Sequence, residues 1–539
     1  MGIDTFNFWI RRLRIVNVSR TCSSVLSLLI DANGILHTAR NYVTASDRTL
    51  FSNDQEYENR KKALAKIKRK QLIDEMLMVI VEILNFLINE YKPSKTVVIS
   101  VDGVAPFAKI TQQRTRRYIA SLKDTTVVSP IEITPGTELM KSIDKKIVDW
   151  IRSSDFPCEK VIYSSYAVKG EGEHKIIDLI RKGEIEDGNG YHIIFSKDSD
   201  LNILSLLSPF RDKIVVSQES VDGFISIKQF TDYLAEKMGS GTNLTKENIV
   251  ADFVLLITFL GNDFLPKLFA FTDVETSVSY LICLYNAVFV KKICTRPLVN
   301  IENYKINWRS LKSLLRVMSS HEHELLIKKS KINFRFGSEL LYLVENYETF
   351  RKHWYLKEQE PKTSTGKVIC SPTEPDADDI ERMSKLYLYG LQWVMSYYSG
   401  RGTDGFVYSY YRAPLIRDLY HHCGEPEFDF PDVKLEIPHQ LVAVIPPSHS
   451  SIIGKLAPLI EPGGKLEPFA PINFQIENEA RHNDFHQVPL IPFINPLLLI
   501  KAVGKVKKTD KENIVVKKER KDEFIAVREE IRLFFTRKT

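Results

Sequence analysis

Apolar residues in the first half of the chain form short runs that alternate with longer helical patterns. The short runs are rich in Val and Ile, which favour strands. They cover residues 25–30, 96–101, 161–168, 191–196 and 214–217. Helical patterns stand between them, over residues 59–90, 131–150 (after a turn), 169–180 and 248–260. This alternation predicts an α/β fold with a mostly parallel central sheet flanked by helices.

The pattern loosens after about residue 290. Residues 305–355 have helical spacing, whereas residues 361–379 are rich in Pro, Thr, Ser and Asp and predict a mobile loop. An aromatic segment over 383–420 and Pro-rich, apolar sequence over 428–499 follow. We therefore expect a second, mixed helical and irregular segment that packs on the sheet. The predicted units are a core (1–290), a helical connector with the loop (291–380), the second segment (381–500) and a basic tail (501–539).

The stretch from residue 96 to residue 118 combines a predicted buried strand with a basic helix. The strand ends before Asp102, a carboxylate followed by a turn glycine. In the helix, four hydrogen-bond donors share one face because their spacing is i, i+4, i+7 and i+8. These donors are Lys109, Gln113, Arg116 and Arg117. Such a face beside a carboxylate predicts a phosphate site next to a metal site; the alternative is a solvated basic helix after an ordinary turn.

Further carboxylates follow the ends of the predicted strands and of the 248–260 helix. Because the carboxyl ends of parallel strands meet at one edge of a sheet, these acids should gather there, where they would repel one another unless cations lay between them. Carboxylates without a His or Cys cluster suit Mg²⁺ or Mn²⁺, and two such ions are the usual arrangement for phosphodiester hydrolysis. For any single acid a helix N-cap is the alternative. The predicted metal ligands and catalytic acids are Asp31, Asp102, Glu171, Glu173, Asp198, Asp200 and Asp263.

Composition narrows the class of protein. The 539 residues are 44% hydrophobic and 26% charged, as in a globular protein with a large core, and no apolar run is long enough to cross a membrane. The six cysteines are scattered without a CxxC pair, which predicts free thiols in a reducing compartment. The net charge of +6 lies in residues 501–539, which hold 13 basic and 7 acidic residues. For this tail a solvated charged helix is the default prediction, and any nucleic-acid affinity of the rest must come from local patches.

Several strings of residues are long enough to be distinctive. In the first part of the chain they are MGIDTFNFWI (1–10), DANGILH (31–37), DGVAPFAKITQQRTRRY (102–118), ITPGTELM (133–140), GEGEHKI (170–176), KDSDLNIL (197–204) and DFVLLITFLGNDFLP (252–266). In the second part they are GLQWVMSYYSG (390–400), RAPLIRD (412–418), QLVAVIPPS (440–448) and VPLIPFI (488–494). In this order and spacing, over most of residues 1–495, they resemble a compact form of the Xrn-type 5′→3′ exoribonucleases, relatives of the flap endonucleases.

The resemblance implies a nuclease core like that of the PIN domains and flap endonucleases, and it implies roles for particular residues. The seven acids match the family's two-metal centre, and the four donors of the 109–117 face match its pocket for a 5′-monophosphate. His37 matches a residue that stacks on the first base, a contact that tolerates any base. Trp393 is a candidate for the opposite stacking face, with packing in the core as the alternative.

The function implied by the resemblance is processive hydrolysis of single-stranded 5′-monophosphate RNA to nucleoside 5′-monophosphates, as in mRNA decay. The expected cofactors are two Mg²⁺ or Mn²⁺ ions, and the expected enzyme is a monomer without a membrane partner. We expect it in the cytoplasm, with the nucleus as the alternative. The alternative functions are a DNA flap endonuclease or 5′ exonuclease, which resembles this chain in its acidic centre, and a non-catalytic RNA-binding scaffold.

The sequence departs from the family pattern in two places. Lys169 stands where Pro usually precedes the GEGEH string. In DGFVYSYYRAP (404–414), Asp404 and Phe406 stand where Trp is usual. These departures bear on how the second segment guides RNA and leave the predicted metal centre intact.

Overall fold

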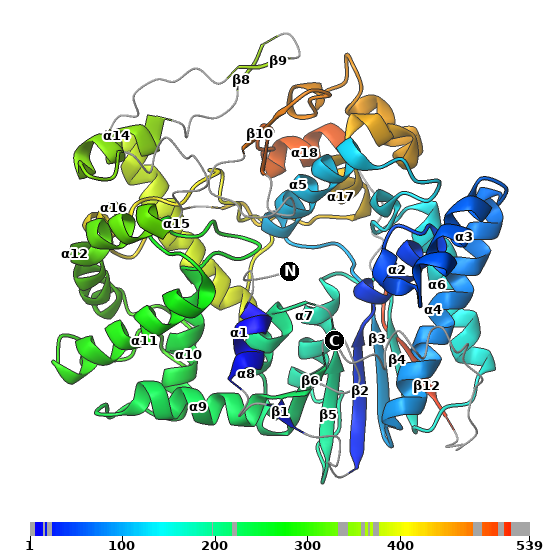
Figure 1. Cartoon of the computed structure of the whole chain (residues 1–539), viewed down its shortest axis with the longest axis horizontal. Coiled ribbons are helices and arrows are strands. Elements are labelled where there is room, and N and C mark those ends of the chain that lie inside the picture. The colour runs from blue at the N-terminus through cyan, green and yellow to red at the C-terminus, as the bar shows by residue number, and fades with distance from the viewer. Residues whose placement is uncertain are drawn as a thin grey trace.

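The fold is taken from a computed structural model of the chain. It describes residues 6–13, 17–18, 24–196, 198–217, 224–332, 343–356, 362–364, 367–369, 377–428, 430–477, 488–504 and 511–518. In Figure 1 a central sheet has helices on both of its faces, a large group of helices lies to its left, and α5, α17 and α18 lie together above it.

A mixed sheet forms the centre of the molecule. Among the described residues it has eight strands in the order β1-β7-β6-β5-β2-β3-β4-β12. The five middle strands from β6 to β4 are parallel, whereas β7, β1 and β12 are each antiparallel to the strand beside them. The strands are β1 (Asn17–Val18), β2 (Val25–Asp31), β3 (Thr96–Ser100), β4 (Lys160–Ser164), β5 (Tyr191–Phe195), β6 (Ile214–Ser217), β7 (Phe224–Ser226) and β12 (Ile514–Lys517). The predicted mostly parallel α/β sheet is confirmed.

Alternate residues of the strands face two different cores, because successive side chains of a strand point to opposite faces. Leu28 and Ile30 of β2 lie in the core with α2, α4 and α6, whereas Leu29 lies in a larger core with α7, α8 and α10. The first three helices are α2 (Asn33–Val43), α4 (Arg69–Tyr91) and α6 (Glu138–Ser153). The other three are α7 (Gly172–Arg181), α8 (Asp200–Leu206) and α10 (Lys246–Thr258).

Further helices extend the larger core away from the sheet. They are α1 (Phe6–Arg12), α9 (Ile227–Gly239), α11 (Val274–Val290), α12 (Trp308–Ile332), α14 (Tyr347–Leu356), α15 (Ala377–Tyr398) and α16 (Ile416–His421). A third core joins α5 (Phe107–Lys123) to α17 (Ile437–Val444), the 3₁₀ segment Pro447–Leu459 and α18 (Pro496–Val503). Helix α5 therefore connects the sheet to the second segment, which packs on the sheet domain as predicted.

Part of the charged tail is a strand, so the prediction of a solvated helix is wrong there. β12 pairs antiparallel with β4 and forms one outer edge of the sheet. Lys511 N–H donates to Ala167 O at 3.1 Å and Lys518 N–H donates to Glu159 O at 2.8 Å, which extends the attachment. Four residues within a charged segment carry too little periodicity to indicate a strand, and the partner strand lies far earlier in the chain.

Other predicted elements have different bounds. The helix over 59–90 is two helices, α3 (Asp54–Leu64) and α4, and at the start of α4 the Gln71 side chain accepts from Lys68 N–H at 3.0 Å. The strand over 161–168 ends at Ser164. Most of the predicted loop over 361–379 lies outside the described residues, but its described parts form a hairpin of β8 (Lys362–Ser364) and β9 (Lys367–Ile369), and α15 begins at Ala377. Besides α17 and α18, the 428–499 stretch holds an antiparallel strand pair, β10 (Gln475–Glu477) and β11 (Val488–Leu490).

Two further expectations concern composition. Among the described residues, no helix combines the length and the apolar character that crossing a membrane needs. The described cysteines, Cys158, Cys283, Cys294 and Cys423, are free thiols, and Cys22 and Cys370 lie outside the described residues. The division of the chain at residues 290, 380 and 500 stays a prediction.

A buried carboxyl group links α10 to its neighbours in the larger core. Asp252 is fully buried, and its Oδ1 accepts a hydrogen bond from Val299 N–H at 2.8 Å while its Oδ2 accepts one from the Tyr285 hydroxyl at 2.8 Å. Burial raises the pKa of Asp252 from 3.8 to about 7, although both hydrogen bonds act in the opposite direction. The folded protein therefore binds this proton more tightly than the unfolded chain does.

Asp252→Asn should flatten the pH dependence of stability between about pH 4 and pH 7. A carboxyl group whose pKa is raised by folding stabilises the fold fully below its unfolded pKa, and this contribution is lost as the pH rises towards 7. Asparagine still accepts from Val299 and can donate to the Tyr285 hydroxyl. The free energy of unfolding of the variant minus that of the wild type should therefore rise with pH in this window, by up to about 1.4 kcal/mol per pH unit. Denaturant titrations at several pH values measure the difference; a constant difference would contradict the prediction.

Candidate metal centre and phosphate pocket

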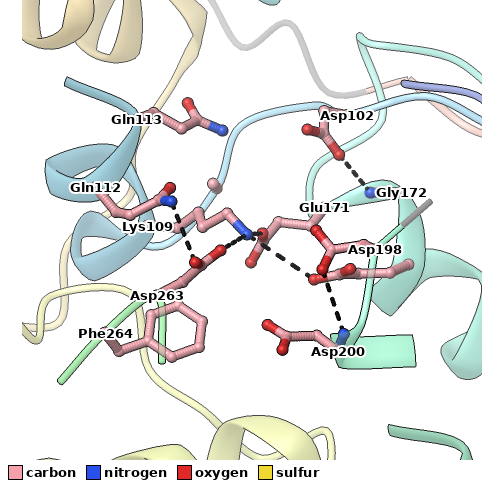
Figure 2. Close-up of polar contacts among 12 residues, drawn as sticks. Asp102, Lys109, Gln112, Gln113, Glu171, Gly172, Asp198, Asp200, Asp263 and Phe264 are labelled. Atoms are coloured by element: carbon pink, nitrogen blue, oxygen red, sulfur yellow. Dashed lines mark hydrogen bonds and ion pairs between the residues drawn. The ribbon is translucent and has the colours of Figure 1, made fainter. Parts of the chain in front are cut away.

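The ends of the parallel strands bring the predicted acids to one edge of the sheet. Asp31 is the last residue of β2, and Asp102 lies two residues beyond β3. Glu171 and Glu173 come after the end of β4, and Asp198 and Asp200 come after the end of β5. Asp263 comes from the loop after α10. β3 and β4 are added on one side of β2, and β5 and β6 on the other, so the strand order reverses at β2. Open α/β sheets bind ligands at such a reversal. Figure 2 shows the acids from these separate loops meeting beside α5.

Two glycines allow the acid-bearing loops to approach each other. Gly103 N–H donates to Gly170 O at 2.9 Å, and a Cβ atom at Gly103 would lie 1.9 Å from Val168 O. Gly172 N–H donates to Asp102 Oδ1 at 2.7 Å (Figure 2), and a Cβ atom there would lie 2.8 Å from Asp31 Oδ1. A side chain at either glycine would push the loops apart, so these positions set the spacing of the acids.

Lys109 of α5 lies among the acids. Its Nζ atom is 2.5 Å from Glu171 Oε2, 2.7 Å from Asp263 Oδ2 and 3.9 Å from Glu173 Oε1, and all four side chains are at most 6% exposed. Burial opposes the charge of Lys109, but Asp263 and Glu171 hold its pKa well above the ordinary value. Burial likewise opposes the charge of Asp263, yet Lys109 and Arg116 hold the pKa of this carboxyl below its usual range.

Three other carboxyl groups, those of Asp31, Glu173 and Asp200, have raised pKa values. Burial raises the pKa of Asp31 to about 7, and the charge of Asp102 adds to the rise. Burial and the charge of Asp198 raise the pKa of both Glu173 and Asp200 well above the usual range. Like charges held together away from water favour a bound cation, which stabilises all of them at once.

Asp200 is a buried carboxyl group for which the described side chains supply no hydrogen-bond donor. The residue is 1% exposed, and neither carboxylate oxygen accepts a hydrogen bond from the described residues. A buried carboxyl group without donors stays ionised only with a positive charge nearby. The surrounding ligand atoms are mainly carboxylate oxygens; Glu171, Glu173 and His174 each offer one atom within 4.8 Å of the others. This donor set fits a hard divalent cation such as Mg²⁺ or Mn²⁺.

The predicted donor face of α5 is not a solvated basic surface. Lys109 and Gln113 are both 5% exposed. Arg116 Nη2 lies 3.2 Å from Asp263 Oδ1, and its side chain is about one third exposed. Gln112, which the spacing argument left out, donates from Nε2 to the same Asp263 oxygen at 3.1 Å (Figure 2). The helix face therefore lies directly against the acid cluster.

Arg117 and Gln113 complete the predicted donor set but have partners elsewhere. Arg117 donates from Nε to Thr134 Oγ1 at 2.7 Å and from Nη2 to Ile133 O at 3.0 Å, so it anchors the turn before α6. Burial, with the charge of Arg116, lowers the Arg117 pKa to about 10. Gln113 accepts a hydrogen bond from Gln440 of α17. The predicted phosphate pocket is thus built partly by the second segment.

The two predicted stacking residues have opposite environments. His37 is exposed on α2, and its stacking role stays a prediction. Trp393 is 3% exposed, its Nε1 donates to Thr403 O at 2.9 Å, and its ring packs 5.1 Å from that of Phe264 and 4.9 Å from that of Phe406. The structure therefore supports the alternative for Trp393, a side chain packed in the core.

Two tyrosines of α15 reach the acids, and sequence reasoning did not find them. The Tyr397 hydroxyl donates to Glu171 Oε1 at 2.5 Å. The Tyr398 hydroxyl is buried without a hydrogen-bond partner among the described residues; burial first, and then the charges of Asp200 and Asp263, raise its pKa well above the usual value. The two tyrosines lie one helical turn after Trp393. Their spacing on the helix does not indicate a contact with Glu171, which lies more than 200 positions earlier in the chain.

The places where the sequence departs from the family pattern meet in space. The Lys169 ammonium donates to Asp404 Oδ2. The Asp404 carbonyl accepts from Phe107 N–H at 2.8 Å, so this ion pair lies at the start of α5. Phe406 is fully buried. The Lys169–Asp404 ion pair therefore joins the loop before Glu171 to the second segment.

Comparison with known proteins identifies the family. Residues 1–127 and 121–219 match the model of the XRN 5′-3′ exonuclease N-terminus. Residues 243–368 and 366–538 match the model of the Xrn1 helical domain. The chain therefore belongs to the Xrn family of 5′–3′ exonucleases.

Similar curated proteins carry the same kind of name. A "5′-3′ exoribonuclease 1" of Schizosaccharomyces pombe is 23% identical over 83% of this chain and 45% of its own length. A "5′-3′ exoribonuclease 2" of Arabidopsis thaliana is 22% identical over 78% of this chain and 58% of its own length. The human "5′-3′ exoribonuclease 1" is 23% identical over 80% of this chain and 30% of its own length. The chain thus spans between about a third and three fifths of these relatives.

Tyr397→Phe should weaken cation binding without unfolding the protein. The change removes the hydrogen bond that orients Glu171, and loss of such a supporting contact typically costs about tenfold in metal affinity. Calorimetric titration with Mn²⁺ measures the effect. Tyr285→Phe is the matched control, because it also removes a phenol bonded to a buried carboxylate, that of Asp252. Equal Mn²⁺ affinities of the two variants would contradict the assignment.

Asp200→Asn should have opposite effects with and without divalent cations. In EDTA the melting temperature should rise, because one of several repelling buried carboxyl groups is removed. The increase in melting temperature that Mn²⁺ causes in the wild type should shrink, because a ligand is lost. Thermal melts at matched ionic strength test both statements. A variant that Mn²⁺ stabilises as strongly as the wild type would show that Asp200 holds no cation.

Proposed function

We propose that this protein is a 5′→3′ exoribonuclease that hydrolyses single-stranded RNA from a 5′-monophosphate end and releases nucleoside 5′-monophosphates. One observation carries the proposal: a single helix, α5, presents phosphate-binding donors and lies against a cluster of acids, with Lys109 bonded to Glu171 and Asp263. Membership of the family and the names of the relatives support it.

The terminal phosphate is proposed to lie on the donor face of α5. Gln113 supplies an amide donor, and Arg116 supplies a forked, charge-assisted contact from a partly exposed position. Lys109 is a point charge shared between this phosphate and the acids. Arg117, bonded to the turn at residues 133–134, acts by fixing the face. Because Gln113 and Lys109 are buried, the pocket suits one phosphate group and not a longer triphosphate or a cap.

The acids are proposed to hold two Mg²⁺ ions, with Mn²⁺ able to replace them. The ligands would come from Asp31, Asp102, Glu171, Glu173, Asp198, Asp200 and Asp263. Bound divalent cations would supply Lewis-acid stabilisation of the charge on the phosphodiester and a lower pKa for the attacking water. The chain's own part is to keep these carboxylates crowded and dry and to hold Glu171 in place through Tyr397.

The proposed positions of the two sites would account for the direction of cleavage and for its repetition. With the first nucleotide held by its 5′-phosphate, the following phosphodiester lies beside the acids. Water forms a bond to that phosphorus, the bond to the 3′-oxygen of the first nucleotide breaks, and this oxygen leaves with a proton. The remaining RNA then carries a new 5′-monophosphate, which is the same end group that the donor face binds. Stacking of the first base on His37, which is exposed on α2, would be independent of sequence.

The wild-type protein should degrade 5′-monophosphate RNA much faster than the same RNA with a 5′-triphosphate. A difference of at least about tenfold is expected from the loss of one charge-assisted contact in the pocket. Single-turnover digestion of end-labelled RNA, with release of mononucleotides followed over time, gives the rates and the direction. Equal rates would contradict the phosphate pocket. Faster cleavage of branched DNA than of single-stranded RNA would favour a flap endonuclease.

A further inference from the structure

Gln440 of α17 is a fully buried polar residue that lies against α5. Its Oε1 accepts a hydrogen bond from Ala105 N–H at 3.0 Å, and its Nε2 donates to Gln113 Oε1 at 2.9 Å. Ala105 belongs to the short segment between Asp102 and α5. One side chain of the second segment thus contacts both the loop that carries a predicted metal ligand and a residue of the predicted phosphate pocket.

The backbone fixes the polarity of this chain of hydrogen bonds. A backbone N–H can only donate, so the atom of Gln440 that faces Ala105 must be its carbonyl oxygen. The amide nitrogen of Gln440 then faces Gln113, and the atom of Gln113 that receives its hydrogen bond must be an oxygen. The remaining end of the Gln113 amide is therefore its NH₂ group, a donor. Figure 2 shows this nitrogen turned to the side on which Asp102 lies and away from Asp263.

We propose that Gln440 is a positioning residue that sets Gln113 as a donor to the 5′-phosphate, an inference that rests on the proposed function. Without Gln440 the Gln113 amide could rotate by half a turn and present its oxygen to the phosphate. Two oxygens would then repel where a hydrogen bond is needed. Ala105 N–H prevents the corresponding rotation of Gln440, because two buried donors would face each other.

Through Gln440 of α17, the second segment would take part in selecting RNA ends. α17 packs on α5 through the third core, which includes Leu441 and Val444 from α17 and Phe107 and Ile110 from α5. The packing holds the two glutamines at hydrogen-bond distance and keeps water away from them. The donor face of α5 is therefore completed by a residue more than 300 positions later in the chain.

Three variants of the full-length protein test the proposal: Gln440→Met, Gln113→Met and the double variant. Methionine keeps the length of the side chain and removes its hydrogen bonds. Fluorescence anisotropy would measure the affinity for a 5′-phosphorylated RNA oligonucleotide and for the same RNA with a 5′-hydroxyl. Ca²⁺ would replace Mg²⁺ so that binding and not turnover is followed. The ratio of the two affinities isolates the contribution of the phosphate and does not depend on nuclease activity.

Gln440→Met should reduce the preference for the phosphorylated RNA about tenfold, close to the loss caused by Gln113→Met. The double variant should lose no more than Gln113→Met alone, because Gln440 acts through Gln113. Gln392→Met is the matched control: Gln392 also accepts from a backbone N–H, that of Ile306 at 2.8 Å, and donates to a backbone oxygen, that of Tyr304 at 3.1 Å. This control should keep the full preference.

Two outcomes of the variant measurements would overturn the proposal. Gln440→Met with the wild-type preference would show that Gln440 does not set Gln113. A double variant whose loss is the product of the two single losses would show that Gln440 acts independently of Gln113. A wild-type protein that binds both RNAs equally would also refute the phosphate pocket of the proposed function, and the wild-type measurement alone distinguishes that failure from the other two.

Discussion

The site depends on a buried cation, Lys109, that lies among several carboxylates. Lys109 contacts Glu171 and Asp263, yet the pKa values of Asp31, Glu173 and Asp200 stay raised by burial and by neighbouring carboxylates. Burial of uncompensated charge is among the most costly features a protein can contain. Bound ligands can offset this free-energy cost. Carboxylate oxygens without donors, as at Asp200, favour divalent cations as these ligands. The proposed phosphate site lies on the same helix, whose Lys109 and Arg116 both contact Asp263 of the acid cluster.

The second segment completes this site from three directions. Tyr397 of α15 donates to Glu171, and Gln440 of α17 bonds to Gln113 and to Ala105. Lys169 pairs with Asp404 just before the acid-bearing turn. At the opposite edge of the sheet from β1, the strand β12 adds to β4, and Lys511 bonds to the loop that leads to Glu171. The acids of the sheet are therefore held in place by residues that are remote in sequence.

The positions of the acids and of the donor face could be predicted from the sequence because both follow from local periodicity. Strand runs that end in Asp31 and Asp102 place carboxylates at one edge whatever the details of the sheet, and a spacing of four residues places Lys109 and Gln113 on one helix face. It could not predict Gln440 or Tyr397, since their roles depend on how a distant helix packs on the sheet. Nor did four residues of a charged tail reveal β12, because a strand at a sheet edge is specified by its partner.

The most direct test of the account is a crystal structure of the protein with Mn²⁺ and a nucleoside 5′-monophosphate, with the manganese located by anomalous scattering. The account predicts manganese bonded to carboxylate oxygens that include those of Asp200, and the phosphate bonded to the amide nitrogen of Gln113 and to Arg116. Manganese elsewhere than among the seven acids, or a phosphate that avoids the donor face of α5, would contradict it.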